Sequence, residues 1–175
     1  MSTPAPVAPF ITRDALQNRI AELAKEIRAD AGAEHLHLIC VLKGAVLFLA
    51  DLIREMTGTV TIDFMALSSY SGGTTSSGEV RLIKDLDYGL QDRHVVIVED
   101  IVDTGLTLHY LQEILRARGP KSLRTACLLS KPSRRQIDVH VDYIGFTIED
   151  RFVVGYGLDF SEQYRNLPYI GVYQG

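Results

Sequence analysis

The chain has few of the features that mark membrane, secreted or nucleic-acid-binding proteins. Among its 175 residues are only two cysteines, and its formal net charge is −4. A slight excess of acidic residues argues against a protein built around nucleic-acid phosphates. No apolar run approaches the roughly 20 residues needed to span a bilayer, and the longest, residues 45–53, is interrupted by Asp51. These absences predict a soluble globular protein with neither a nucleic acid nor a membrane as partner.

The cysteines and the N-terminus indicate the compartment. Cys40 and Cys127 both lie in apolar stretches, without CxxC or metal-ligand spacing, which suits a reducing environment. The opening residues, "MSTPAPVAPF", lack the basic and apolar regions of a secretory signal. The length suits one domain. We therefore predict a cytoplasmic protein with a single domain over residues 1–175, in which residues 1–10 form a flexible leader.

Hydrophobic spacing predicts helices alternating with strands. Apolar residues recur at helical intervals over 13–31, 43–58 and 105–119. Apolar or alternating stretches typical of strands cover 35–42, 59–70, 79–86, 93–100, 121–132 and 141–150. Near-continuous apolar strands separated by helices indicate an α/β fold, with a parallel sheet covered on both faces.

Polar residues follow several of these strands. Lys43-Gly44, residues 68–70, Glu99-Asp100 and Lys131 all come just after an apolar run. Ligands of open parallel sheets bind in the crevice outside the carboxyl ends of the strands. We therefore expect these side chains to converge on one rim.

The stretch "VVIVEDIVDTGLTL", residues 95–108, contains a candidate anion site. A helix is predicted to start at Leu106, and the free N–H groups of a helix start favour an anion. Gly105 lets the backbone come close to a ligand, while Thr104 and Thr107 add hydroxyl donors. The loop has no lysine of the kind that grips a triphosphate. This combination suits a single monoester phosphate.

The acid pair in the same stretch needs a different partner. Glu99 and Asp100 would repel a phosphate, but carboxylates accept bonds from hydroxyls and bind hydrated cations. A sugar diol at one end and its 5′-phosphate at the other would satisfy the whole stretch. The alternative is an ordinary strand-turn-helix, with Asp103 as N-cap and two solvated acids.

These residues resemble a known family. "VVIVEDIVDTGLTL" is similar to the phosphoribosyl-pyrophosphate signature of the type I phosphoribosyltransferases. The segments "VLKGAVLFLADL", "SSYSGGTTSSGEVRLIKDL", "LLSKPSRR" and "RFVVGYGLDFSEQYRNLPYIGVY" resemble, in order, those of the bacterial hypoxanthine-guanine members. The resemblance covers most of the chain beyond about residue 36. It implies a parallel-sheet fold with a small hood formed by terminal segments.

The resemblance also implies an activity in purine salvage. Such enzymes transfer ribose 5-phosphate from phosphoribosyl pyrophosphate to N9 of hypoxanthine or guanine, giving IMP or GMP and pyrophosphate. Mg²⁺ is the implied cofactor, because it would neutralise the departing pyrophosphate. A homodimer or homotetramer is the implied assembly.

Matching the motifs residue by residue implies roles for particular side chains. Asp103 would be the general acid/base at N7 of the purine. The ribose phosphate would be bound by Glu99, Asp100, Asp103, Thr104, Gly105, Leu106 and Thr107. The pyrophosphate would be bound by Lys43, Gly44, Ser69, Tyr70 and Arg165. The purine site would comprise Lys131, Phe152, Val153 and Asp159, and the metal would be held by Glu99, Asp100 and Asp159.

Several of these residues also have plain structural readings. By chemistry alone, Lys131 is better interpreted as a solvated lysine at a strand end. Phe152 fits the core as well as it fits stacking on a base. The segment from Ser69 and Tyr70 through residue 78 suits a surface loop as well as a lid over the pyrophosphate. The family pattern makes the Leu42–Lys43 bond a candidate for the cis form.

Three other functions are compatible with parts of the pattern. A regulatory protein could use the same fold to sense phosphoribosyl pyrophosphate, but it would need a partner surface that the sequence does not display. A phosphotransfer receiver domain also has paired acids after a strand, but there they follow the first strand. A sister enzyme that prefers xanthine with guanine is the nearest alternative.

Overall fold

A computed structural model describes residues 7–69 and 80–174 of the chain. Tyr70 and the predicted lid, residues 71–78, lie outside the described residues. The elements are, in order, β1 (Pro9–Ile11), α1 (Arg13–Ala31), β2 (Leu36–Leu42), α2 (Val46–Glu55), β3 (Val60–Ser69), β4 (Val80–Lys84), β5 (His94–Val102), α3 (Leu106–Arg116), β6 (Ser122–Ser130), the 3₁₀ turn η1 (Pro132–Arg134), β7 (Tyr143–Thr147), β8 (Val153–Val154) and β9 (Ile170–Val172).

The central sheet has the strand order β4-β3-β2-β5-β6-β7. All its pairings are parallel except that of β4 with β3, which is antiparallel. The prediction of a parallel sheet is therefore confirmed for every strand but β4. Only residues 70–79 separate β3 from β4, and a parallel crossover needs a dozen or more residues.

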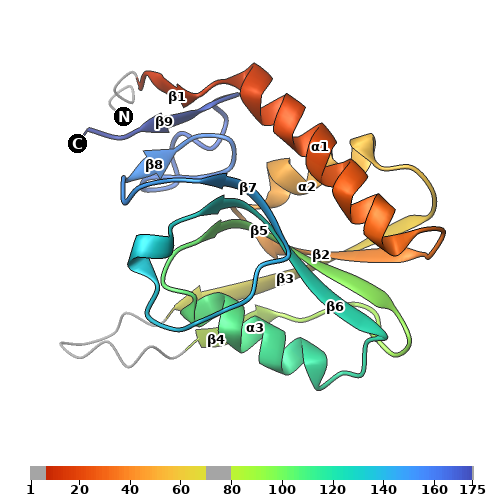
Figure 1. Ribbon diagram of the computed structural model, residues 1–175. Coiled ribbons are helices and arrows are strands. Elements are labelled where there is room, and N and C mark those ends of the chain that lie inside the picture. The colour runs from red at the N-terminus through yellow and green to blue at the C-terminus, as the bar shows by residue number, and fades with distance from the viewer. Residues whose placement is uncertain (1–6, 70–79, 175) are drawn as a thin grey trace.

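Helices cover both faces of the sheet, as predicted (Figure 1). Alternate residues of β2 enter different cores because successive strand side chains point to opposite faces. Leu36, Leu38 and Cys40 pack in the cluster that contains the buried residues of α1 and α2. Ile39 and Val41 pack in the cluster that contains those of α3.

Helix α1 has the bounds that its apolar spacing predicts. Thr12 caps its start, since the Thr12 hydroxyl accepts the N–H of Ala15 at 3.2 Å. Its buried stripe consists of Leu16, Ile20, Leu23, Ala24 and Ile27. The helix ends at Gly32, which has φ +60° and donates its N–H to the Arg28 carbonyl.

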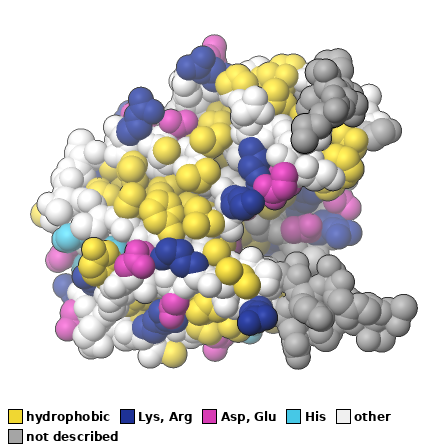
Figure 2. All heavy atoms as spheres, turned by 180° about the vertical axis from the view of Figure 1, so that it is seen from behind, with side chains coloured by type: hydrophobic (Ala, Val, Ile, Leu, Met, Phe, Trp, Pro, Cys, Tyr) yellow, Lys and Arg dark blue, Asp and Glu magenta, His cyan; other side chains and the backbone are white. Residues whose placement is uncertain are grey.

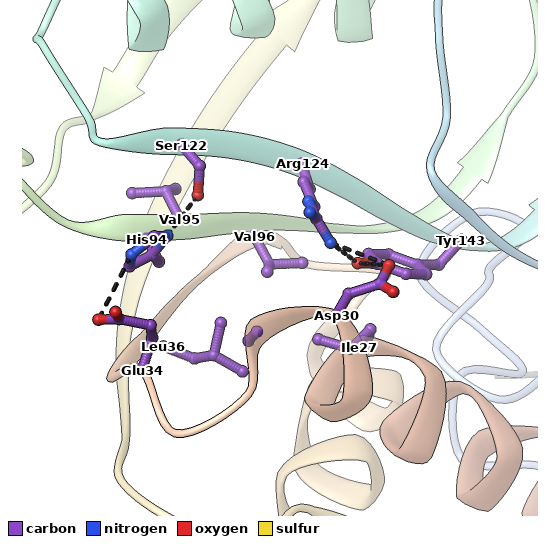
Figure 3. A pocket seen from close by; sticks show the side chains of 11 residues that line it. Ile27, Asp30, Glu34, Leu36, His94, Val95, Val96, Ser122, Arg124 and Tyr143 are labelled. Atoms are coloured by element: carbon purple, nitrogen blue, oxygen red, sulfur yellow. Dashed lines mark hydrogen bonds and ion pairs between the residues drawn. The ribbon is translucent and has the colours of Figure 1, made fainter.

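Polar pairs tie the end of α1 to the sheet, around a small pocket of about 170 Å³ (Figure 3). Asp30 accepts hydrogen bonds from Arg124 at 2.9 Å and from the Tyr143 hydroxyl at 2.8 Å. His94 lies between the Ser122 hydroxyl, at 2.8 Å, and the Glu34 carboxylate, at 3.5 Å. This pocket lies at the amino ends of β5 and β6, away from the predicted rim.

The terminal segments form a second sheet, with the order β1-β9-β8. It joins the two ends of the chain, because Pro9 of β1 pairs with Gly171 of β9. The hood implied by the family resemblance is therefore present. Residues 9 and 10, predicted as part of a flexible leader, instead belong to this sheet, because β9 supplies hydrogen-bond partners. Within residues 7–69 and 80–174, no helix is long and apolar enough to cross a membrane.

Candidate active site

The acid pair lies inside β5 rather than after its end. Strand β5 continues to Val102, since Ile101 and Val102 still pair with Leu129 and Ser130 of β6. Glu99 is consequently 6% exposed. The alternative interpretation of two solvated acids is therefore wrong for Glu99.

Burial makes both carboxyl groups reluctant to ionise. The pKa of Glu99 is raised well above its ordinary value, by desolvation first and then by the neighbouring Asp100. Desolvation also raises the pKa of Asp100 to about 6, although the Ile101 N–H, which it accepts at 2.7 Å, and the Arg165 charge oppose that rise. A ligand that supplies hydroxyl hydrogens or a cation would compensate both groups.

Beyond the acids, the loop into α3 encloses a cavity of about 260 Å³. Its walls are formed by residues 99–105 together with Thr107 and Leu108. The N-cap of α3 is Gly105, with φ +86°, and not Asp103. The α3 start at Leu106 is confirmed, and its first N–H is 3.4 Å from the Thr104 hydroxyl. The two threonines and the start of α3 thus line a cavity large enough for a small anion.

Gly105 is required by its protein surroundings. Its positive φ disfavours a side chain, and a Cβ there would lie 2.8 Å from the Ile137 carbonyl oxygen. We predicted that this glycine lets the backbone approach a ligand. In the structure, the group that comes close is the backbone of Ile137.

Hydrogen bonds from the segment after β6 hold the cavity loop in place. The Lys131 N–H donates to the Val102 carbonyl at 3.0 Å, and the Gln136 N–H donates to that of Thr104 at 2.9 Å. Arg135 donates to the Val102 carbonyl at 2.6 Å. Sequence analysis missed Arg135, because a basic pair in a polar stretch carries no local sign of a long-range role.

Lys131 is buried, with 6% of its surface exposed. Its Nζ lies 3.6 Å from Oδ1 of Asp150. The interpretation of Lys131 as a solvated lysine is therefore wrong. The Lys131 N–H is bonded to Val102, the residue before Asp103. Oδ1 of Asp103 accepts a hydrogen bond from Nε of Arg134 at 3.2 Å.

On the other side of the acids, the turn after β2 packs directly against Asp100. The Leu42–Lys43 peptide bond is cis. A Cβ on Gly44 would overlap the Asp100 carboxylate, so only glycine fits there. The Lys43 side chain is exposed, and its Nζ donates to Oε2 of Glu162 at 2.9 Å. The turn therefore joins the acid pair to the hood.

Arg165 is the centre of an ion-pair cluster in the hood. Its Nη2 lies 2.9 Å from Asp159 and 3.0 Å from Oε1 of Glu162, and its Nη1 donates to the Gly157 carbonyl at 2.7 Å. Glu162 thus bridges Lys43 and Arg165, both predicted to bind pyrophosphate. Sequence analysis missed Glu162, since a single acid in a polar loop is unremarkable by pattern.

The three predicted metal ligands do not form a single preformed coordination site. Among residues 7–69 and 80–174, no group of three His, Cys, Asp or Glu side chains is arranged to hold a metal ion. Glu99 and Asp100 are adjacent, whereas Asp159 is paired with Arg165. A metal ion at this site would need oxygen atoms from another molecule to complete its coordination.

Phe152 lies on the surface of the hood and is 53% exposed, so its interpretation as a core residue is wrong. Its ring contacts Phe160 and Tyr173 edge-on, each with centroids 5.9 Å away. Val153, in β8, is buried and pairs with Val172. An exposed ring held by other rings offers a flat surface to a planar ligand.

The comparisons with known proteins agree with this geometry. Residues 12–161 match the family model of the phosphoribosyl transferase domain. A hypoxanthine-guanine phosphoribosyltransferase of Bacillus subtilis (strain 168) is 49% identical over 163 residues, which are 93% of this chain and 91% of the relative. The chain belongs to the hypoxanthine-guanine phosphoribosyltransferase family.

Solved structures of family members have the same fold. A hypoxanthine-guanine phosphoribosyltransferase from Bacillus anthracis has a TM-score of 0.92 at 44% identity, covering 96% of this chain and 99% of that one. A hypoxanthine phosphoribosyltransferase from Staphylococcus aureus has a TM-score of 0.91 at 44% identity, covering 95% and 91%. The receiver-domain alternative is therefore wrong.

In this phosphoribosyltransferase the predicted site residues fall into three neighbouring groups. The acids and the cavity loop follow one another along β5 and into α3. Lys131 follows β6 and is bonded through its N–H to the start of that loop. Lys43, Gly44, Asp159 and Arg165 lie where the turn after β2 meets the hood. Ser69 is the last residue of β3, and Tyr70 is outside the described residues.

Proposed function

We propose that this phosphoribosyltransferase transfers ribose 5-phosphate from phosphoribosyl pyrophosphate to N9 of hypoxanthine or guanine. The products would be IMP or GMP and pyrophosphate. The observation that carries the proposal is the buried Lys131, whose N–H donates to the carbonyl of Val102, next to a small anion cavity lined by Asp103 and the acid pair. The names of the similar proteins support the same substrates.

The ribose 5-phosphate would occupy the cavity loop. Thr104, Gly105, Leu106 and Thr107 surround the start of α3, where unpaired amides and the helix dipole favour a phosphate. Glu99 and Asp100 would accept hydrogen bonds from the ribose hydroxyls. Both acids have raised pKa values, so hydroxyl donors would relieve the cost of burying their charge.

Mg²⁺ fits the donor set of this site. Glu99, Asp100 and Asp159 offer only hard oxygen atoms, and Mg²⁺ usually takes one or two protein carboxylates together with water and substrate phosphates. A ready-made cage of three ligands is therefore unnecessary. The ion would neutralise charge on the departing pyrophosphate.

At the sugar, the bond between C1 and the pyrophosphate oxygen would break as N9 of the purine bonds to C1. Positive charge develops at the sugar meanwhile, and the neighbouring carboxylates stabilise it. Asp103 would take the proton that the purine releases at N7. Lys131 would donate a hydrogen bond to O6 of the base, and Phe152 would stack on its ring while the Val153 backbone contacts its edge.

The pyrophosphate would lie at the turn after β2. Lys43 and Arg165 supply positive charge there, and Gly44 lets the turn pack against the Asp100 carboxylate. Ser69 and Tyr70 would complete this side of the site. Glu162 now pairs with both cations, so the pyrophosphate would replace one carboxylate partner with a stronger anion.

We also propose a homodimer or homotetramer in the cytoplasm. Apolar side chains of α2 and β3 are exposed on the face shown in Figure 2, where hydrophobic atoms gather in its centre. Val46 and Ile62 are each 38% exposed, and Ile53, Val60 and Ile62 border a hollow of about 610 Å³. A second copy of the chain would bury this surface.

The cytoplasmic location rests on the cysteines. Both cysteines are free and buried, which suits a reducing compartment.

The test is a product assay with separate bases. Purified protein would be mixed with phosphoribosyl pyrophosphate, Mg²⁺ and either hypoxanthine, guanine, xanthine or adenine, and nucleotide formation followed by absorbance and chromatography. We expect IMP and GMP, with loss of activity after chelation and recovery when Mg²⁺ is restored. A protein that used xanthine better than hypoxanthine would belong to the sister activity. Absence of any nucleotide would refute the proposal.

A further inference from the structure

A row of alternating charges connects the two ends of the proposed purine site. Nζ of Lys131 lies 3.6 Å from Oδ1 of Asp150, and Oδ2 of Asp150 lies 3.8 Å from Nη1 of Arg134. Nε of Arg134 in turn donates to Oδ1 of Asp103 at 3.2 Å. The row therefore runs from the proposed O6 donor to the proposed N7 acid/base, through two residues that have no role so far.

Burial makes Asp150 important to Lys131. The Lys131 side chain is 8% exposed, whereas that of Asp150 is 52% exposed. A buried ammonium needs a counterion, because removing a charge from water is costly. Within the described part of the chain, Asp150 is the only acid at ion-pair distance from Lys131. Asp150 is thus the counterion that holds the Lys131 ammonium in place.

Arg134 plays the corresponding part for Asp103. The backbone of Asp103 is already held, because Arg135 donates to its carbonyl at 2.5 Å. Its carboxylate is held by Arg134 alone among the described residues. A planar guanidinium can contact two carboxylates at once, and Arg134 does so with Asp103 and Asp150. A change at one carboxylate therefore alters the pairing of the other.

We propose that Asp150 and Arg134 are positioning residues for purine recognition and for proton transfer. Asp150 orients Lys131 toward O6, Arg134 orients Asp103 toward N7, and their mutual contact couples the two ends. This inference rests on the proposed function. All members of the row except Lys131 are partly exposed, and exposed ion pairs add little to stability. Arg134→Ala should therefore hardly change the folding stability. Asp150→Asn also removes the counterion of the buried Lys131, so both variants are assayed at a temperature where they are folded.

The test uses steady-state kinetics with hypoxanthine at saturating phosphoribosyl pyrophosphate and Mg²⁺. For Asp150→Asn we expect KM for hypoxanthine to rise about tenfold, with kcat within about threefold of the parent, because a charge-assisted contact to the base is weakened. For Arg134→Ala we expect kcat to fall about tenfold, because the proton acceptor is misplaced. KM for phosphoribosyl pyrophosphate should stay within about twofold in both.

Matched controls lie outside the row. Glu149 is next to Asp150 and pairs with Arg151 at 3.3 Å, and Arg116 pairs with Glu113 on α3 at 3.2 Å. Glu149→Gln and Arg116→Ala should both behave as the parent does. Among conservative variants, Asp150→Glu should recover most of the affinity for hypoxanthine. Arg134→Lys should recover less of kcat, because one ammonium cannot span two carboxylates in the same geometry.

The double variant tests the coupling. In Asp150→Asn/Arg134→Ala, the loss in kcat/KM should be clearly smaller than the product of the two single losses. Losses that multiply would overturn the coupling, and parental KM and kcat in both single variants would overturn the inference as a whole. Phosphoribosyl pyrophosphate should raise the Tm of each single variant as much as it raises that of the parent. A smaller rise would also overturn the inference, since the substitution would then have disturbed the structure of the whole site. A parent that forms no nucleotide would refute the proposed function and this inference with it.

Discussion

Replacing Asp100 with asparagine should stabilise the protein at neutral pH while it weakens substrate binding. Burial raises the pKa of Asp100 from an ordinary 3.8 to about 6. Below pH 3.8 the carboxyl is protonated in both the folded and the unfolded chain, so it does not change the free energy of unfolding. Between that pH and about 6, only the folded chain keeps the proton, and stability falls as pH rises. Above about pH 6 the carboxyl is ionised in both states, and the folded chain carries the full free-energy cost of the buried charge.

The size of the effect follows from the shift in pKa. One pKa unit corresponds to about 1.4 kcal/mol, so the penalty at pH 7 is at most about 3 kcal/mol. Asp100 is partly exposed, so water reduces this value, and we expect a gain of about 1–3 kcal/mol in the free energy of unfolding. Asparagine retains an oxygen for the Ile101 N–H, which Asp100 accepts at 2.7 Å. The substitution therefore removes the charge and little else.

The assay is urea unfolding of parent and variant across pH, with a chelator present. The advantage of Asp100→Asn should grow from pH 4 to pH 6 and then level off. Asp63→Asn is the matched control, because Asp63 is 2% exposed and accepts hydrogen bonds on both carboxylate oxygens. Its Oδ1 accepts the Phe64 N–H at 2.7 Å, and its Oδ2 accepts the N–H groups of Asp87 at 2.9 Å and Tyr88 at 3.2 Å, whereas asparagine keeps only one oxygen. Losing the other acceptor should destabilise the protein. An advantage of Asp100→Asn that does not vary with pH, or a loss of stability at pH 8, would refute this reasoning.

Three further substitutions test the proposed roles. Asp103→Asn should slow turnover by roughly 10²–10⁴-fold and leave the Kd of phosphoribosyl pyrophosphate nearly unchanged, so turnover within twofold of the parent would contradict its role. The parent should use adenine up to about 10⁴-fold less well than hypoxanthine, and Lys131→Ala should lower kcat/KM for hypoxanthine by about 10–100-fold; an unaffected kcat/KM would make Lys131 a structural residue. Glu162→Gln should tighten binding of phosphoribosyl pyrophosphate about threefold in calorimetry, since it frees Lys43 and Arg165 from a surface ion pair, and weaker binding would contradict the competition.

Much of the fold could be predicted because its signals are local. The apolar stripe of α1 and the continuous apolar strands recur at the spacing of the elements they form, so their bounds agree to within a few residues. The short strands β1, β8 and β9 were not predicted, because two or three residues carry no periodicity. They are strands because β9 pairs with β8 on one side and with β1, from the other end of the chain, on the other.

The site shows the same division. The order of acids, glycine and threonines in residues 99–107 was enough to indicate a ribose phosphate, because these residues are consecutive. The burial of Lys131 could not be predicted, since its surroundings are formed by strands β5 and β6 and by Asp150 after β7. Glu162 and Arg134 were missed for the same reason.

By itself, the sequence determined which longer segments become helices and strands of the central sheet, and which rim of that sheet carries polar groups. Both depend on the order of neighbouring residues, and a chain displays that order directly. Only the tertiary structure decided which charges lose their water and which meet. Lys131 is buried against Asp150, Asp100 is packed against Gly44, and Glu162 lies between Lys43 and Arg165. Desolvation and ion pairing depend on distance in space, so the chemistry of the site is set by the packing of segments far apart in sequence.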